Sequence, residues 1–144
     1  MYSTIIHATD LQENHFDLAK RAKELSDFYQ ANLILMHVLE PPASLQVAQS
    51  LGFAEFDKPI IEDAKFVMET LGEALNISKE NQIVKIGSIR ELVLQAVQQL
   101  RCDLIVIGRH TPNHIPSFLG STAYGLLHQA SCDVLIMKDT PLST

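Results

Sequence analysis

The sequence predicts an α/β domain built on a parallel sheet, with helices on both faces. Short apolar or β-branched runs alternate along the chain with longer segments whose apolar residues recur every three or four positions. Five strands and four helices are predicted in this way, and such alternation is typical of parallel sheets. In addition, a strand at 104–107 runs into Gly108, and a Gly-Ser-Thr turn at 120–122 opens another helix. A helix that starts beyond a strand end can bind an anion.

The first half of the chain contains two predicted strands and two predicted helices. Residues 3–9 form a short β-branched strand, and residues 10–13 match a capping box for a helix that extends to about residue 29. Residues 32–39 are almost all apolar, which indicates a strand covered on both faces. Residues 43–56 lack a period and predict a loop with a short helical turn. A helix is expected over about 59–75, with this apolar stripe: Ile60, Ala64, Val67, Met68, Leu71 and Leu75.

The second half contains three predicted strands, at 82–86, 104–107 and 133–138, the first of them at a sheet edge. A second capping box at 88–91 opens a helix whose stripe is Ile89, Leu92, Val93, Ala96, Val97 and Leu100. The last helix is expected over about 119–129. Ligands of such folds bind beyond the carboxyl ends of the strands, where the strand order reverses. Asp10 and Gly108 follow or end two strands and are therefore the first candidates for a site.

Length and charge limit the classes of function. A chain of 144 residues predicts one domain, 1–144. A net charge of −6 gives no broad attraction to nucleic acid or to an anionic membrane surface. The chain has no apolar run long enough to cross a bilayer, and its first residues predict a strand rather than a signal peptide. We therefore expect neither nucleic-acid nor membrane partners.

The two cysteines, Cys102 and Cys132, point to a reducing compartment. Each precedes an apolar strand in a near-repeat, CDLIVIG and CDVLIMK, and there is no CxxC motif. If the two strands are neighbours, the thiols could lie close together. Two buried, reduced thiols are the simpler interpretation, and whether they ever pair stays open.

Several segments, in their order and spacing, resemble the universal stress proteins along almost the full chain. They are IIHATD at the start, LILMHV in the second strand, Gly87, then DLIVIG, GST and CDVLIM in the last third. The resemblance implies a single flavodoxin-like (Rossmann-like) domain with strand order 3-2-1-4-5. It also implies a cytoplasmic homodimer, often paired through the last strand, and a role in surviving stress rather than a known reaction.

The resemblance also concerns nucleotide binding. Family members that bind ATP carry G-x2-G-x9-G-[ST] after the fourth strand. Here Gly108 and the pair at 120–121 match, but Thr111 replaces the second glycine and only eight residues, 112–119, follow it. Threonine resists positive φ and close approach to phosphate, and Pro112 and Pro116 remove two N–H donors. Arg109, His110 and His114 could supply polar contacts instead.

The residues that the resemblance implies for a nucleotide each have a structural alternative. Asp10 would contact ribose or a metal, or only cap the first helix. Val38 would contact adenine through its backbone, or only fill the core. Gly108 would approach the ligand, or only allow a tight exit from the strand. Phosphate contacts are implied for Gly120, Ser121 and Thr122, whose two hydroxyls would otherwise cap the last helix.

Metal and catalytic sites are not expected. The six histidines are scattered, and neither an HExxH motif nor a Cys-His cluster is present. A nucleotide hydrolase is disfavoured because there is no Walker A motif, no SGG-type pyrophosphatase loop, and no acid pair with a base. A receiver-like signalling domain would need an acidic cluster at the first strand end and an Asp ending the third. Asp10 stands alone, Gly87 follows the third strand, and Lys138 is a weak match for the required lysine.

The sequence thus favours a cytoplasmic universal stress protein of the founding-member type. It would be a homodimer that acts by interaction, without catalysis and with weak or absent nucleotide binding. The predicted dimer contact is the apolar last strand: Val134, Leu135, Ile136 and Met137. The alternative is a stress protein that binds ATP, with magnesium, as a nucleotide-dependent switch.

Overall fold

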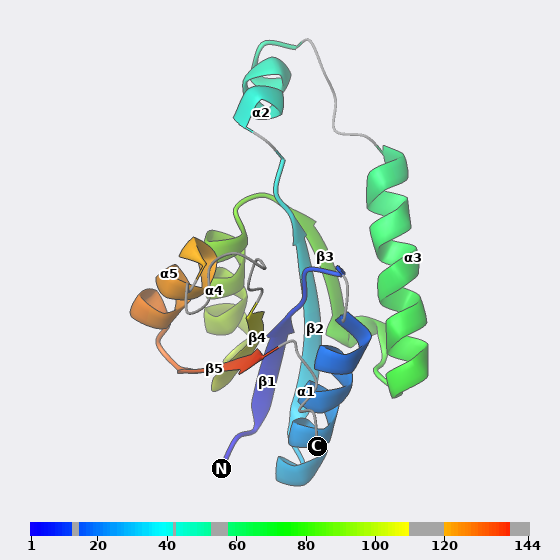
Figure 1. Ribbon diagram of the computed structural model, residues 1–144, viewed down its shortest axis with the longest axis vertical. Coiled ribbons are helices and arrows are strands. Elements are labelled where there is room, and N and C mark those ends of the chain that lie inside the picture. The colour runs from blue at the N-terminus through cyan, green and yellow to red at the C-terminus, as the bar shows by residue number, and fades with distance from the viewer. Residues whose placement is uncertain (13–14, 42, 53–57, 110–119, 139–144) are drawn as a thin grey trace.

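Five parallel strands form one sheet in the order β3-β2-β1-β4-β5 (Figure 1). Its strands are β1 (Thr4–Ala8), β2 (Asn32–Leu39), β3 (Gln82–Ile86), β4 (Leu104–Arg109) and β5 (Asp133–Lys138). This computed structural model describes residues 1–12, 15–41, 43–52, 58–109 and 120–138. The predicted fold class and strand order are confirmed. After β1 the chain adds β2 and β3 on one side of that strand, and it then adds β4 and β5 on the other side. The strand order therefore reverses between β1 and β4.

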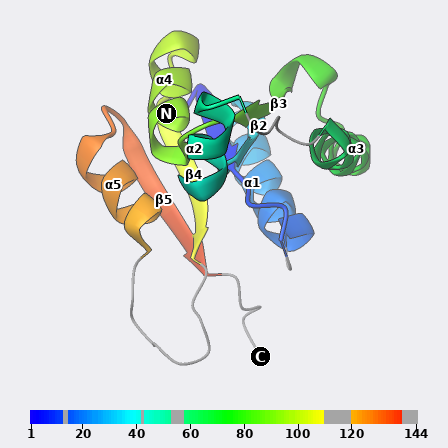
Figure 2. The same cartoon turned by 90° about the horizontal axis from the view of Figure 1, so that it is seen from above.

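Helices cover both faces of the sheet (Figures 1 and 2). One face carries α1 (His15–Tyr29) and α3 (Lys58–Leu75), and the other carries α4 (Ile89–Leu100) and α5 (Ser121–Gln129). A short 3₁₀ turn, η1 (Lys79–Asn81), precedes β3. Side chains alternate across each strand, so the two faces bury separate apolar clusters.

The two clusters divide the central strands by residue parity. Ile5, Leu33, Leu35 and Val106 pack towards α1 and α3, whereas Ile6, Ile34, Met36 and Ile105 pack towards α4 and α5. His7 and His37 share the parity of Ile5 and Leu35 and therefore face the α1 side. Two members of the predicted helix stripes, Ile60 and Leu100, are wrong as core residues: they are 48% and 41% exposed.

The segment after β2 differs from its prediction. A helix of eight residues, α2 (Ala43–Ser50), replaces the expected loop with a short turn. It projects beyond the carboxyl edge of the sheet (Figure 1), and Val47 and Leu51 there are 58% and 64% exposed. The side chains of α2 whose burial is described are mostly exposed, so no buried stripe among them imposes a period on the sequence. Residues 53–56 of this prediction lie outside the described residues.

The two predicted capping boxes have different outcomes. At α4 the Ser88 hydroxyl accepts a hydrogen bond from the Glu91 N–H at 3.4 Å, as the sequence predicts. Asp10 is not the N-cap of α1, because that helix begins only at His15. Its carboxylate instead accepts a hydrogen bond from the Gln12 N–H at 2.9 Å. The alternative role predicted for Asp10, a cap of the first helix, was therefore wrong. Its carboxylate stabilises a turn at the end of β1 instead.

Candidate functional site

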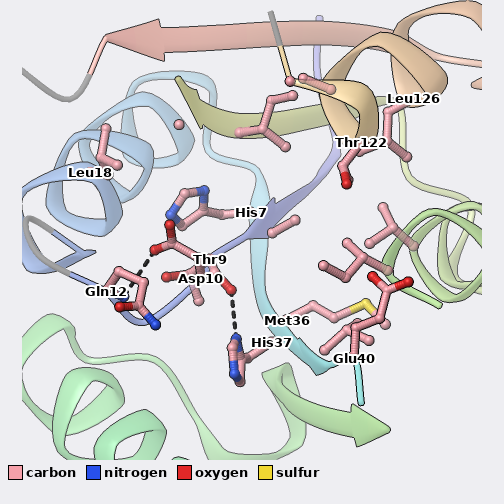
Figure 3. Close-up of a pocket in the computed structure, with 18 of the residues that line it drawn as sticks. His7, Thr9, Asp10, Gln12, Leu18, Met36, His37, Glu40, Thr122 and Leu126 are labelled. Atoms are coloured by element: carbon pink, nitrogen blue, oxygen red, sulfur yellow. Dashed lines mark hydrogen bonds between the residues drawn. The ribbon is translucent and has the colours of Figure 1, made fainter. Parts of the chain in front are cut away.

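A cavity of about 500 Å³ opens at the carboxyl edge of the sheet, where the strand order reverses. It brings together five of the six residues implicated by the sequence: Asp10, Val38, Gly108, Gly120 and Thr122. Ser121 lies in the first turn of α5, beside two of these residues, but does not line the cavity. Figure 3 shows His7, Thr9 and Asp10 on one side and Thr122 and Leu126 of α5 on the opposite side.

The turn after β1 builds the acidic side of the cavity. The Thr9 N–H donates to the Met36 carbonyl at 2.9 Å, which holds the end of β1 against β2. The Thr9 hydroxyl accepts from the Leu11 N–H at 3.1 Å, and Leu11 has a positive φ of 55°. With the Asp10 to Gln12 bond, both side chains stabilise a turn that presents the Asp10 carboxylate at the cavity wall (Figure 3).

Two buried histidines also line the cavity. His37 Nδ1 donates to the Thr9 carbonyl at 2.8 Å, and His7 Nδ1 donates to the Val106 carbonyl at 2.9 Å. A carbonyl oxygen only accepts, so each Nδ1 carries a proton when the ring is neutral. Burial lowers the pKa of His7 from its usual value, 6.5, against the opposing effects of the Val106 carbonyl and the Asp10 charge. His7 is therefore a neutral ring at pH 7, with a lone pair on Nε2.

The α5 side supplies backbone donors. Gly120 is the N-cap of α5 and makes no side-chain hydrogen bond to the helix. The predicted structural role of the Ser121 and Thr122 hydroxyls as helix caps is therefore wrong, since both residues lie inside the first turn. The first N–H that the helix itself uses is that of Tyr124, which donates to the Gly120 carbonyl at 2.9 Å. The preceding first-turn N–H groups and the positive end of the helix dipole are suited to an anion.

The two glycines of the site serve different purposes. A Cβ atom on Gly108 would lie 2.5 Å from Leu18 Cδ1, so this glycine allows α1 to approach β4. The structural alternative predicted for Gly108, a tight exit from the strand, was therefore wrong: β4 continues to Arg109, and the glycine makes room for helix packing. At Gly120 no described atom lies within 4 Å of the position that a Cβ atom would take, and φ is −60°. Nothing in the described fold demands glycine at 120.

Between the acidic side and α5 the cavity is apolar. Its apolar lining comes from β2, β4, α4 and α5: Met36, Val38, Ile89, Val93, Ile107 and Leu126. Asp10 and Glu40 are the acidic residues among the lining. No Lys or Arg side chain is among the lining residues that the structure describes. The N-terminus of α5, at the opposite side from Asp10, is the part of the described lining that suits an anion.

Sequence reasoning missed five polar residues of the cavity: His7, Thr9, Gln12, His37 and Glu40. Both histidines were set aside because the six histidines of the chain are scattered and lack the spacing of metal ligands. Their positions along the strands could have indicated their place in the cavity, because alternate residues of a strand face the same side of the sheet. His7 is two residues before Thr9 and therefore faces the same side. The altered loop after β4 (Thr111 to Leu119, with its two prolines and His114) lies outside the described residues.

Other classes of site have no support within the described ranges. No group of three or more His, Cys, Asp or Glu side chains there is arranged to hold a metal ion. Among the same residues, no helix combines the length and apolar character that crossing a bilayer requires.

Comparison with known proteins places the chain in a family. Residues 1–138 match the model of the universal stress protein family. The chain belongs to the universal stress protein family. Universal stress protein A homolog 2 of Coxiella burnetii is 36% identical over 139 residues, which cover 95% of both chains.

Solved structures of the family share the fold at lower identity. Universal stress protein UspA from Lactobacillus plantarum has a TM-score of 0.72 at 21% identity, covering 94% of this chain and 97% of its own. A universal stress protein in complex with cAMP has a TM-score of 0.65 at 18% identity, covering 96% of this chain and 98% of its own. At these identities the structural likeness concerns the fold alone.

Proposed function

We propose that this universal stress protein binds an adenine nucleotide in the cavity and acts without catalysis as a stress-responsive regulator. The observation that carries the proposal is the convergence of Asp10, Val38, Gly108, Gly120 and Thr122 on one cavity at the point where the strand order reverses. A family structure in complex with cAMP supports the class of ligand. We further propose that residues 1–144 act as one domain, in the cytoplasm.

The polarity of the cavity orients such a ligand. Phosphate would lie at the N-terminus of α5, near Gly120, because the positive helix end and unused N–H groups are there. The apolar lining around Val38 suits the base, and Asp10 lies at the end of β1, the strand between β2 and β4. Asp10 would then contact the sugar. Its carboxylate could also contribute one oxygen to Mg²⁺ bound mainly by phosphate and water.

We propose that the protein is a homodimer paired through β5. This strand has β4 as its partner on one side, and the described residues place no strand on the other. Val134, Ile136 and Met137 are half-buried against the two cores, and Leu135 is 37% exposed. An apolar edge of this kind favours pairing with another chain. A nucleotide bound beside α5 could act on this interface, since α5 leads directly into β5.

A second candidate is a homodimer that acts by protein interaction without bound nucleotide. The sequence favours it through Thr111, the shortened segment 112–119, and the prolines at 112 and 116. Both candidates share the fold and the dimer, and they differ only in whether the cavity holds a ligand. No nucleic acid or membrane is expected to take part in either.

Mass spectrometry of nucleotide that co-purifies with the native protein separates the two candidates. Titration calorimetry with Mg-ATP then measures affinity in solution. We expect binding in the micromolar range, and absence of both co-purified nucleotide and a calorimetric signal would support the second candidate. Gly120→Leu should abolish binding, because its side chain would fill the space against α5. Gly120→Ser is the matched control with a small side chain that is favourable at an N-cap.

A further inference from the structure

His7 carries a buried polar atom that has no partner in the part of the chain that the structure describes. The side chain is 1% exposed, and its Nε2 atom has no hydrogen-bond partner among the described residues. The opposite ring nitrogen is fixed by the Val106 carbonyl, so Nε2 of the neutral ring is an acceptor. An unsatisfied buried acceptor destabilises the folded protein. Such an atom in a ligand cavity calls for a donor from the ligand.

The position of His7 in the sheet indicates which part of a nucleotide would supply that donor. The cavity crosses the strand ends in the order β4, β1, β2, with α5 beside β4. Phosphate, sugar and base are joined in that order, so phosphate at α5 and base near Val38 leave the sugar over β1. Both His7 and Asp10 belong to the β1 end, and Figure 3 shows them next to each other at the cavity wall.

The chemistry of these two groups is complementary to a sugar. Near neutral pH both are acceptors, and one carboxylate oxygen of Asp10 is already used by the Gln12 N–H. A ribose carries two neighbouring hydroxyls, each able to donate one hydrogen bond. We infer that His7 is a specificity-determining residue whose Nε2 accepts a hydrogen bond from a ribose hydroxyl of the bound nucleotide. This inference rests on the proposed nucleotide binding, and it adds that the protein distinguishes nucleotides by their sugar.

Calorimetry with ATP and 2′,3′-dideoxy-ATP tests this role. The unmodified protein should bind ATP about 10-fold more tightly, since the dideoxy sugar leaves Nε2 unsatisfied. In the variant His7→Asn the amide can still donate to Val106 but offers no acceptor at the Nε2 position, so this preference should shrink. His7→Gln, whose amide oxygen reaches that position, should recover part of it.

The ¹⁵N resonance of His7 Nε2 gives a second readout that needs no variant to fold. ATP should shift this resonance in the direction expected when Nε2 accepts a hydrogen bond, and dideoxy-ATP should leave it unchanged. If the resonance does not move with bound ATP, or if His7→Asn keeps the full sugar preference, His7 is not the sugar contact although nucleotide binding stands. A water held between His7 and Asp10 would give this result. If neither nucleotide binds, the proposed function and this inference both fail.

Discussion

Gly108 of β4 and Leu18 of α1 pack so closely that a methyl group on the glycine would lie 2.5 Å from Leu18 Cδ1. Leu18 is buried and also lines the cavity. The contact therefore sets how near α1, and with it the turn carrying Asp10, approaches the end of β4. One small residue links the packing of the fold to the dimensions of the site.

Gly108→Ala is expected to destabilise the protein by about 1–3 kcal/mol, because the added methyl overpacks a buried contact. Urea unfolding measures the change. The same substitution in a Leu18→Ala background should cost clearly less, since the colliding atom is then absent. Equal costs in both backgrounds would contradict the packing role assigned to Gly108.

Leu135→Lys is expected to weaken the proposed dimer, because it places a charge in the middle of the exposed β5 edge. Light scattering across a dilution series should show dissociation at a concentration at least about 10-fold higher than for the unmodified protein, a cost of about 1.4 kcal/mol. The matched control is Ile86→Lys, since Ile86 is 41% exposed on β3 at the other edge. A Leu135→Lys protein that dimerises like the control would exclude β5 as the interface.

The buried His7 should make stability fall as the solution is acidified. Its pKa in the folded state lies below the usual 6.5, so below that value the unfolded chain binds a proton that the folded chain excludes. The stability that depends on a neutral His7 is fully present above pH 6.5, and it is lost as the pH falls towards the pKa of His7 in the folded state. In that window His7→Asn should flatten the pH dependence of the unfolding free energy by up to about 1.4 kcal/mol per pH unit. An unchanged slope would contradict the buried, neutral state of His7.

The cysteine thiols should react slowly in the native protein. Burial raises the pKa of Cys102 to about 11 and also raises that of Cys132. At about pH 8, native Cys102 should be alkylated by iodoacetamide at least ~100-fold more slowly than glutathione, because only the thiolate reacts. Mass spectrometry in concentrated urea is the control. Two rapid alkylations there indicate two free thiols, whereas none would show that Cys102 and Cys132 are paired.

Most of the fold follows from local sequence patterns. The apolar run at 32–39 is a central strand because both its faces are covered, and the period of Val93, Ala96 and Val97 identifies the buried face of α4. The patterns failed where burial does not constrain the sequence. The described side chains of α2 are mostly exposed and impose no period, and at Ile60 and Leu100 the regular stripe continues onto exposed positions.

By itself the sequence determined the alternation of strands and helices, and its resemblance to a family predicted which residues would contact a nucleotide. Only the tertiary structure decided that Asp10, Val38, Gly108, Gly120 and Thr122 meet in one cavity, because they are brought together by the reversal of strand order. It alone distinguished the packing role of Gly108 from the open position of Gly120. It also revealed the unpartnered His7 nitrogen, since hydrogen-bond partners far apart in sequence are set by how strands pair.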